Sequence, residues 1–139
     1  MQEVYKEIRE ADGIIWATPV YFWSMSGLTK IALDRTYALC FPKLQQASKI
    51  GGLIIVAASR GCMNAANPFQ MYFIYNHMFS AEFAWGYAGE KGEIKKDTIA
   101  IKMAKEMVHQ MTSLFQANLR YPEEFDMPLQ RLVRKKYSA

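Results

Sequence analysis

Cysteine and histidine are scarce in this chain, which has two of each among 139 residues. Cys40 and Cys62 lie too far apart to form a metal-ligand motif, and reduced thiols are their expected state. His77 and His109 have no clustered carboxylates or cysteines beside them, so we interpret both as structural. No nucleophile elbow, phosphate-binding P-loop or zinc-ligand pattern is present. We therefore expect neither a metal site nor a catalytic side chain.

Long apolar runs are also missing. The longest, Leu53 to Ala58, has the length of a strand, whereas a membrane-spanning helix needs roughly 18 apolar residues. The first twelve residues form a charged amphipathic pattern, so no signal peptide is visible. These absences predict a cytoplasmic protein without a membrane partner. Because half of the residues are apolar, the chain can build the core of one domain.

Acidic residues are absent after Asp126, and this absence accounts for the net charge of +4. Residues 127–139 carry Arg131, Arg134, Lys135 and Lys136, whereas residues 1–126 carry 13 basic and 13 acidic side chains. A nucleic-acid-binding domain more often shows a basic face across its whole surface. We therefore interpret residues 122–139 as a solvated basic tail and expect no nucleic-acid partner. Association with nucleic acid through Arg131 to Lys136 is a weaker alternative.

The apolar pattern along the chain alternates between helical and strand-like segments. Helices are predicted over Met1–Ala11, Leu28–Cys40, Phe69–Phe79 and a last long segment that Asp97 caps; strands are predicted over Ile14–Ala17, Lys49–Ser59 and Glu82–Ala88. Asn67-Pro68 has the chemistry of a helix start. The run Ile14–Ala17 has no polar alternation, which predicts a parallel strand covered on both faces. This order of elements predicts a doubly wound α/β fold.

The segment Thr18 to Ser26 is the strongest functional signal. It follows a predicted strand directly, and it contains the three consecutive aromatic residues Tyr21, Phe22 and Trp23. Ligands of open α/β sheets bind at the carboxyl ends of the strands, and a flat redox ring needs an apolar surface to stack on. The segment Ser59-Arg60-Gly61-Cys62 ends the next predicted strand and is expected to form the neighbouring wall. The alternative is that the aromatics belong to the core or to a subunit interface.

Three segments carry a family resemblance. ADGIIWATPVYFWSMSGLTKIALDRT, from Ala11 to Thr36, resembles the NADPH-dependent FMN reductase family, most closely its multimeric flavodoxin-like and iron–sulfur flavoprotein branch. KIGGLIIVAASRG and EFAWGYAGEKGEIKKDTIAIKMAKEM resemble the same branch more loosely. The resemblance implies a flavodoxin-like sheet of strand order 2-1-3-4-5, of which this chain holds the third, fourth and fifth strands. The family's first strand, phosphate loop, first helix and second strand have no counterpart.

The resemblance therefore predicts an incomplete flavodoxin-like domain over residues 1–121. Without the first strand, Gly13 to Ala17 becomes an unpaired apolar sheet edge, which favours association. The cysteines that hold the iron–sulfur cluster in that branch would lie in the missing region, so the cluster is not carried over. The chain is expected to be either a fragment of a longer protein or a product that completes itself by forming a homo-oligomer.

The resemblance also implies a function. Members bind FMN, take a hydride from NAD(P)H at flavin N5, and reduce a small acceptor such as a quinone or free flavin. The positions expected to bind the cofactor are Thr18, Pro19, Val20, Tyr21, Phe22, Ser24, Met25, Ser59, Arg60 and Gly61. Trp23 stands where the family usually has a small residue, so its indole either closes over the ring or blocks it. The alternative is a truncated, non-catalytic α/β module that self-associates and does not bind FMN by itself.

Overall fold

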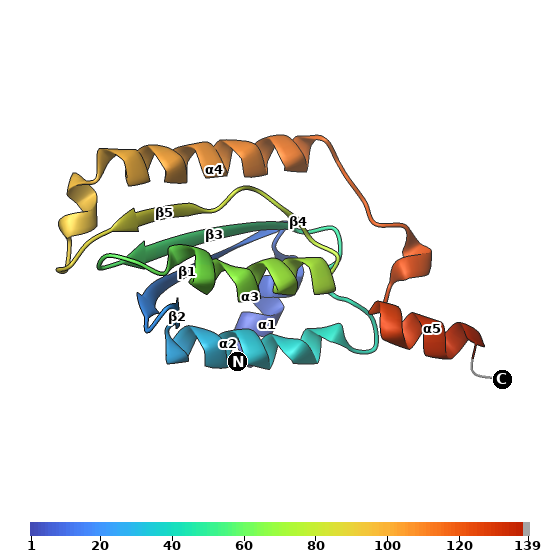
Figure 1. The fold of residues 1–139 in the computed structure, drawn as a ribbon. Coiled ribbons are helices and arrows are strands. Elements are labelled where there is room, and N and C mark those ends of the chain that lie inside the picture. Colours follow the sequence, from blue (N-terminus) through green and yellow to red (C-terminus); the bar gives the residue numbers. More distant parts are fainter. Residues whose placement is uncertain (138–139) are drawn as a thin grey trace.

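The computed structural model describes residues 1–137 as a sheet covered by helices on both faces (Figure 1). The sheet is built around β3 (Ile50–Ala57), which pairs in parallel with β1 (Gly13–Tyr21) on one side. On its other side β3 pairs in parallel with β4 (Phe79–Ser80) and β5 (Ala84–Tyr87). A short strand, β2 (Ser24–Met25), pairs antiparallel with the end of β1. The predicted α/β class with a mostly parallel sheet is confirmed.

The helices form two layers. One face of the sheet carries α1 (Gln2–Glu10), α2 (Gly27–Arg35), which continues into η1 (Thr36–Cys40), and α3 (Cys62–Tyr75). The other face carries α4 (Thr98–Gln116), which the short η2 (Glu93–Lys96) precedes (Figure 1). The chain then runs through η3 (Glu123–Phe125) into α5 (Leu129–Tyr137). Asp97 caps α4, as predicted, because its carboxylate accepts hydrogen bonds from the Ile99 and Ala100 amides.

The main core lies between the sheet and α3. Phe69 and Phe73 of α3 are fully buried against Leu53 and Ile55 of β3, and Trp16 of β1 packs against the Phe69 ring at 5.9 Å between centroids. A smaller core lies under α4, where Met107 packs against β3 and β5. The methionines of α4 are thus core-filling residues, as expected from their helical spacing. These two cores hold β1 and β3 at a fixed register.

β1 does not match the predicted strand with two covered faces. Its side chains alternate: Ile14, Trp16 and Thr18 face the core under α3, whereas Ile15 on the opposite face is 47% exposed. α4 covers β3 and β5 rather than β1, which leaves this face open. Within residues 1–137 the outer edge of β1 pairs only with β2, at Val20 and Tyr21. The expected open edge is therefore present over Gly13 to Pro19.

Three predicted boundaries are wrong. The helix predicted over Phe69–Phe79 ends at Tyr75, and Phe79 lies in β4 instead. The segment after Ala17 is not a loop, because β1 continues to Tyr21 and turns tightly at Phe22 and Trp23 into β2. Asn67-Pro68 does not start a helix either, since α3 begins at Cys62 and carries Pro68 in its interior. Gly61, in a left-handed conformation with φ of 94°, provides the actual start. Burial of α3 against the sheet outweighs the hydrogen bond that Pro68 cannot donate.

The carboxyl-terminal segment packs back on the body of the molecule. The Leu44 amide donates to the Asp126 carbonyl at 2.8 Å, and the Arg131 guanidinium donates to the Cys40 carbonyl at 3.2 Å. The same guanidinium lies 4.5 Å from the centroid of the Phe41 ring. One basic residue of the predicted solvated tail is thus engaged with the fold. None of the helices in residues 1–137 has the length and apolar character needed to cross a bilayer.

Candidate ligand site at the carboxyl ends of β1 and β3

Two neighbouring strands end beside each other and frame a cavity. The parallel register places Pro19 of β1 opposite Val56 of β3, so the residues that follow both strands meet at one edge of the sheet. The cavity has a volume of about 460 Å³, within the range of small-molecule sites. It is lined by Val20, Phe22, Trp23, Ala58, Ser59 and Arg60. The two segments that the sequence singled out are therefore brought together.

The turn that forms one wall has an unusual backbone. Phe22 and Trp23 both adopt left-handed conformations, with φ of 46° and 62°, between the paired residues Tyr21 and Ser24. Two-residue hairpin turns of this kind strongly favour Asn-Gly, because a side chain in the left-handed region costs roughly 1–2 kcal/mol. Burial does not offset this conformational cost, because Phe22 is 97% exposed and Trp23 is 56% exposed. Strained residues that persist with exposed side chains are typical of functional sites.

Gly61 allows the second wall to approach the first. A Cβ atom at this position would lie 3.0 Å from the Trp23 Cα atom and 3.0 Å from the Val20 Cγ1 atom. The left-handed φ of Gly61 also suits glycine and starts α3 directly beside the cavity. Glycine is required here for two reasons, the close approach and the backbone conformation. Both keep the turn of β1 in contact with the start of α3.

A hydrogen-bonded support lies behind the turn. The Ser26 amide donates to the Thr18 hydroxyl at 3.1 Å, and the Ser26 hydroxyl accepts from the Thr29 amide at 3.2 Å and so caps α2. Both serine and threonine are buried. This support ties the start of α2 to the end of β1, on the two sides of the hairpin.

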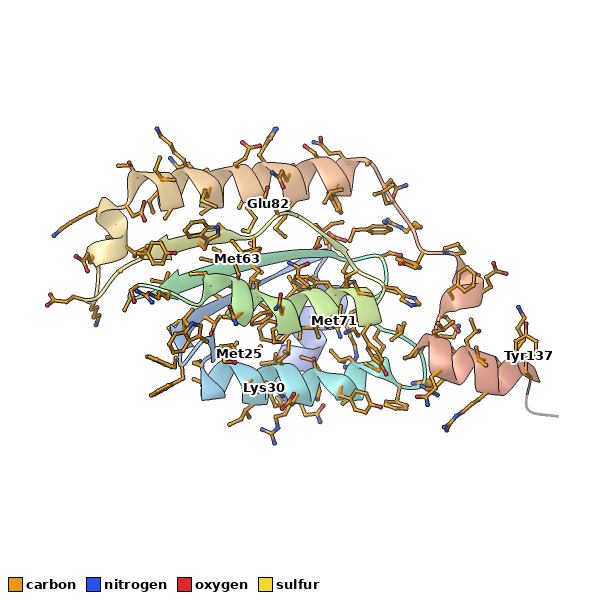
Figure 2. All side chains as sticks on the ribbon, in the orientation of Figure 1. Met25, Lys30, Met63, Met71, Glu82 and Tyr137 are labelled. Carbon is orange, nitrogen blue, oxygen red and sulfur yellow. The ribbon has the colours of Figure 1, made fainter. Side chains whose placement is uncertain are left out.

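The ten predicted cofactor-binding residues take up four different places. Val20, Phe22, Ser59 and Arg60 line the cavity, together with Trp23 and Ala58, which were not among the ten. Thr18 and Met25 are buried behind it, where Met25 joins the core under α3 (Figure 2). Gly61 contacts the inner side of the turn. Pro19, Tyr21 and Ser24 are exposed outside this cavity. Trp23 could have been included from its place inside the aromatic run.

The site carries one positive charge, and the nearby thiol of Cys62 is protonated. Arg60 is the only charged residue among those that line the cavity, and it is exposed. Cys62 is buried at the start of α3, and burial raises the pKa of its thiol, which keeps it protonated. The first turn of α3 presents amides that no side chain caps. The arrangement offers apolar walls to a flat ring and positive potential to an anion, without an acid–base residue.

These residues fit the ring of FMN better than its phosphate. Aromatic and aliphatic side chains form the walls, and the Ser59 hydroxyl and the Arg60 guanidinium supply donors for the polar edge of a reduced ring. Among the residues that line the cavity there is no second cation and no glycine-rich loop that could enclose a phosphate group.

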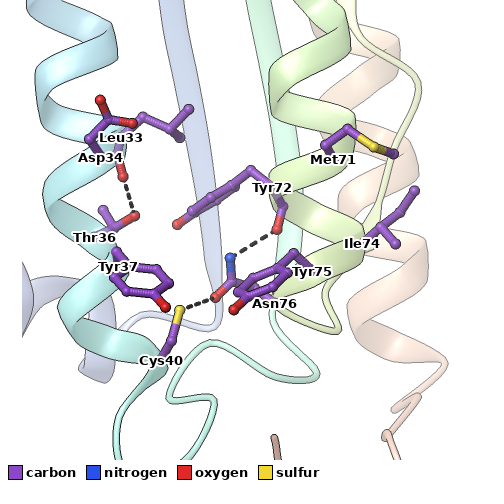
Figure 3. A pocket seen from close by; sticks show the side chains of 10 residues that line it. All are labelled: Leu33, Asp34, Thr36, Tyr37, Cys40, Met71, Tyr72, Ile74, Tyr75 and Asn76. Atoms are coloured by element: carbon purple, nitrogen blue, oxygen red, sulfur yellow. Dashed lines mark hydrogen bonds between the residues drawn. The ribbon is translucent and has the colours of Figure 1, made fainter. Parts of the chain in front are cut away.

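A larger groove of about 610 Å³ lies elsewhere, between α2–η1 and α3 (Figure 3). Its buried polar groups are already paired with one another. The Asn76 carboxamide accepts from the Gln46 amide at 3.1 Å and from the Cys40 thiol at 3.5 Å, and the Tyr72 hydroxyl donates to Gln46. Burial raises the pKa of Tyr72 to about 12, so this phenol stays neutral. Because its buried polar groups satisfy one another and it does not lie at the carboxyl ends of the strands, we place the chemistry at the smaller cavity.

Comparisons with known proteins identify the family of the chain. The family model for NADPH-dependent FMN reductase matches residues 1–90, a range that includes β1, β3 and both cavity walls. An iron–sulfur flavoprotein of Methanocaldococcus jannaschii is 30% identical over 117 residues. This match covers 77% of the chain and 60% of the archaeal protein, so the chain spans less than two thirds of that relative. Within residues 1–137 no group of His, Cys, Asp and Glu could hold a metal ion.

Solved structures show the same fold. The Trp repressor binding protein of Bacillus subtilis superposes with a TM-score of 0.70 at 24% identity, covering 77% of this chain and 74% of that protein. RosB, solved with the bound intermediate 8-demethyl-8-formylriboflavin-5′-phosphate, superposes with a TM-score of 0.75 at 18% identity. That superposition covers 99% of this chain and 59% of RosB.

Proposed function

The chain belongs to the NADPH-dependent FMN reductase family, and on this premise we propose that it is an FMN-binding oxidoreductase. Reducing equivalents would come from NAD(P)H and pass to a small acceptor such as a quinone or a free flavin. The observation that carries the proposal is the cavity at the ends of β1 and β3, with its exposed aromatic wall. RosB, whose fold is similar, was solved with a flavin derivative bound, which supports a flavin as the ligand.

The chain's own residues would bind and orient the cofactor. Val20, Phe22 and Trp23 would hold the ring, and Arg60 would favour negative charge on it or on the phosphate. Bound FMN would supply the redox chemistry, because no protein side chain at the site is suited to it. No general acid or base is needed, in agreement with the absence of histidines and carboxylates from the cavity lining. Water would be kept from the covered ring face by the aromatic turn.

Flavin titration tests this proposal. Addition of the purified chain to FMN is expected to quench the flavin fluorescence, with saturation at stoichiometric protein. A Tyr75→Ala variant should bind FMN as the parent does, because Tyr75 lines the other groove. Absence of any spectral change with the parent protein would refute the proposal, and a loss of binding in Tyr75→Ala alone would move the site to the groove of Figure 3.

We also propose that the chain forms a homo-oligomer through the face of α2, η1 and α3. This face exposes many large apolar side chains: Leu28, Ile31, Tyr37, Phe41, Met63, Met71, Ile74 and Tyr75. Figure 2 shows Met63 and Met71 on α3 and Lys30 on α2. Each of these side chains is more than 40% exposed, whereas a standard interface would bury roughly 800 Å² on each partner. An apolar face of this size favours a covering partner.

A second candidate function, a non-catalytic module that self-associates through the edge of β1, is favoured by the open strand and by exposed Ile15. Light scattering on two variants separates the interfaces. Ile74→Lys is expected to dissociate the oligomer, because it places a charge in the helical face, and Ile15→Lys should leave the oligomer intact. The reverse pattern would assign the interface to the β1 face, and a monomeric parent at micromolar concentration would contradict both arrangements.

A further inference from the structure

The aromatic turn at Phe22 and Trp23 is not explained by the stability of the fold. Both residues lie in the left-handed region that Asn and Gly prefer, and both expose most of their side chains. Neither ring belongs to either of the two cores. A residue that is strained and contributes little burial is retained for what it contacts. Both rings line the cavity, so a ligand in the cavity would contact them.

Trp23 is held more firmly than Phe22. The Cδ1 atom of the Trp23 indole lies 3.3 Å from the position that a Cβ atom on Gly61 would occupy, and the Trp23 backbone lies against the same glycine. The start of α3 therefore supports the indole from one side. Phe22, at the tip of the turn, is almost fully exposed. Trp23 is thus the aromatic side chain that the fold positions against the cavity.

The two sources of affinity at the site differ in strength. The affinity that stacking on an aromatic surface provides changes little with salt concentration, because stacking depends on dispersion and on excluding water. Arg60, the only charged residue that lines the cavity, is exposed, and an exposed ion pair is screened by water and salt. Contacts with the ring of a bound flavin would therefore contribute more binding free energy than contacts with its phosphate.

We infer that Trp23 supplies the main stacking surface of this site, so that the site recognises the flat ring rather than the phosphate. The ligand class is the isoalloxazine ring system with or without a 5′-phosphate. This inference rests on the proposed flavin-binding function. It assigns a stacking role to Trp23, which was not among the ten predicted cofactor-binding residues.

The test compares riboflavin with FMN by fluorescence titration on three proteins. The parent is expected to bind riboflavin within about threefold of its affinity for FMN. Trp23→Asn, which suits the left-handed backbone and so favours folding, is expected to weaken both ligands about tenfold. Trp23→Phe, which keeps a flat ring, should stay within about threefold of the parent. Tyr137→Leu, a substitution of an exposed aromatic residue on α5 outside the cavity and outside the proposed interface, is the control and should change neither affinity.

Tryptophan emission provides a readout that a purely structural role would not move. Riboflavin is expected to quench the tryptophan emission of the parent more strongly than that of Trp23→Phe. The remaining Trp16 and Trp85 pack against the core, away from the ligand. A parent that binds FMN a hundredfold more tightly than riboflavin, or a Trp23→Asn variant that binds as the parent does, would overturn the inference and leave flavin binding intact. A parent that binds neither ligand would overturn the proposed function itself.

Discussion

Replacing Gly61 by alanine is expected to lower the free energy of unfolding by about 3 kcal/mol. Two costs add up at this position. The φ of 94° is strained for any residue with a Cβ atom, and the added methyl would lie 3.0 Å from the Trp23 Cα atom, which cannot rotate away. Chemical denaturation of the variant measures the sum. The same substitution should weaken flavin binding, because the turn must shift to make room for the methyl group.

Gly92→Ala is the matched control. Gly92 has a φ of 85°, close to that of Gly61, but a Cβ atom there meets nothing within 4 Å. Its substitution should cost about 1 kcal/mol, the price of the left-handed backbone alone. The difference between the two variants isolates the contact with the aromatic turn. Equal losses of stability would show that Gly61 does not hold the turn in place.

Replacing Phe69 by alanine is expected to cost about 4 kcal/mol of folding free energy. The ring is completely buried between α3 and the sheet and packs against Trp16, so its removal leaves a cavity that rigid strands cannot close. Thermal and denaturant unfolding followed by far-ultraviolet circular dichroism measure the loss. An effect of this size is a large part of the stability of a small domain.

Met71→Ala is the control on the same helix. Met71 is 60% exposed, and methionine and alanine differ little in helix propensity, so the cost should stay below about 1 kcal/mol. If Phe69→Ala were as mild as Met71→Ala, α3 would not pack on the sheet as described. Both variants are measured at a protein concentration that keeps the parent in one oligomeric state, because Met71 lies on the proposed interface.

The elements that the sequence predicted correctly are those with strong local signals. β3 carries a continuous apolar run, and Asp97 precedes a long stretch of helical spacing, so both boundaries lie close to those predicted. The sequence wrongly predicted a helix start at Asn67-Pro68, because a capping residue followed by proline is typical of helix starts. The helix in fact begins five residues earlier, at Cys62. The true start depends on the left-handed backbone of Gly61, which follows from tertiary contact with the turn of β1 rather than from local sequence.

The sequence predicted which segments form the site, but it did not predict the conformation of the turn. A strand end followed by three aromatics pointed to the correct edge of the sheet, and Phe22 and Arg60 do line one cavity. The tight hairpin could not be predicted, because no turn rule places phenylalanine and tryptophan at two left-handed positions. Thr18 and Met25 were expected to bind the ligand because of the family resemblance of this segment. Strand alternation turns both inward instead.

The hairpin at positions 22 and 23 also bears on any attempt to engineer this chain for heat resistance. Asn-Gly at the tip would relieve roughly 2 kcal/mol of backbone strain and sacrifice little packing. A library screened only for survival at high temperature would therefore be drawn to these two codons first. It would enrich robust clones that have lost their aromatic rings, so selection at this spot has to include a flavin in the assay.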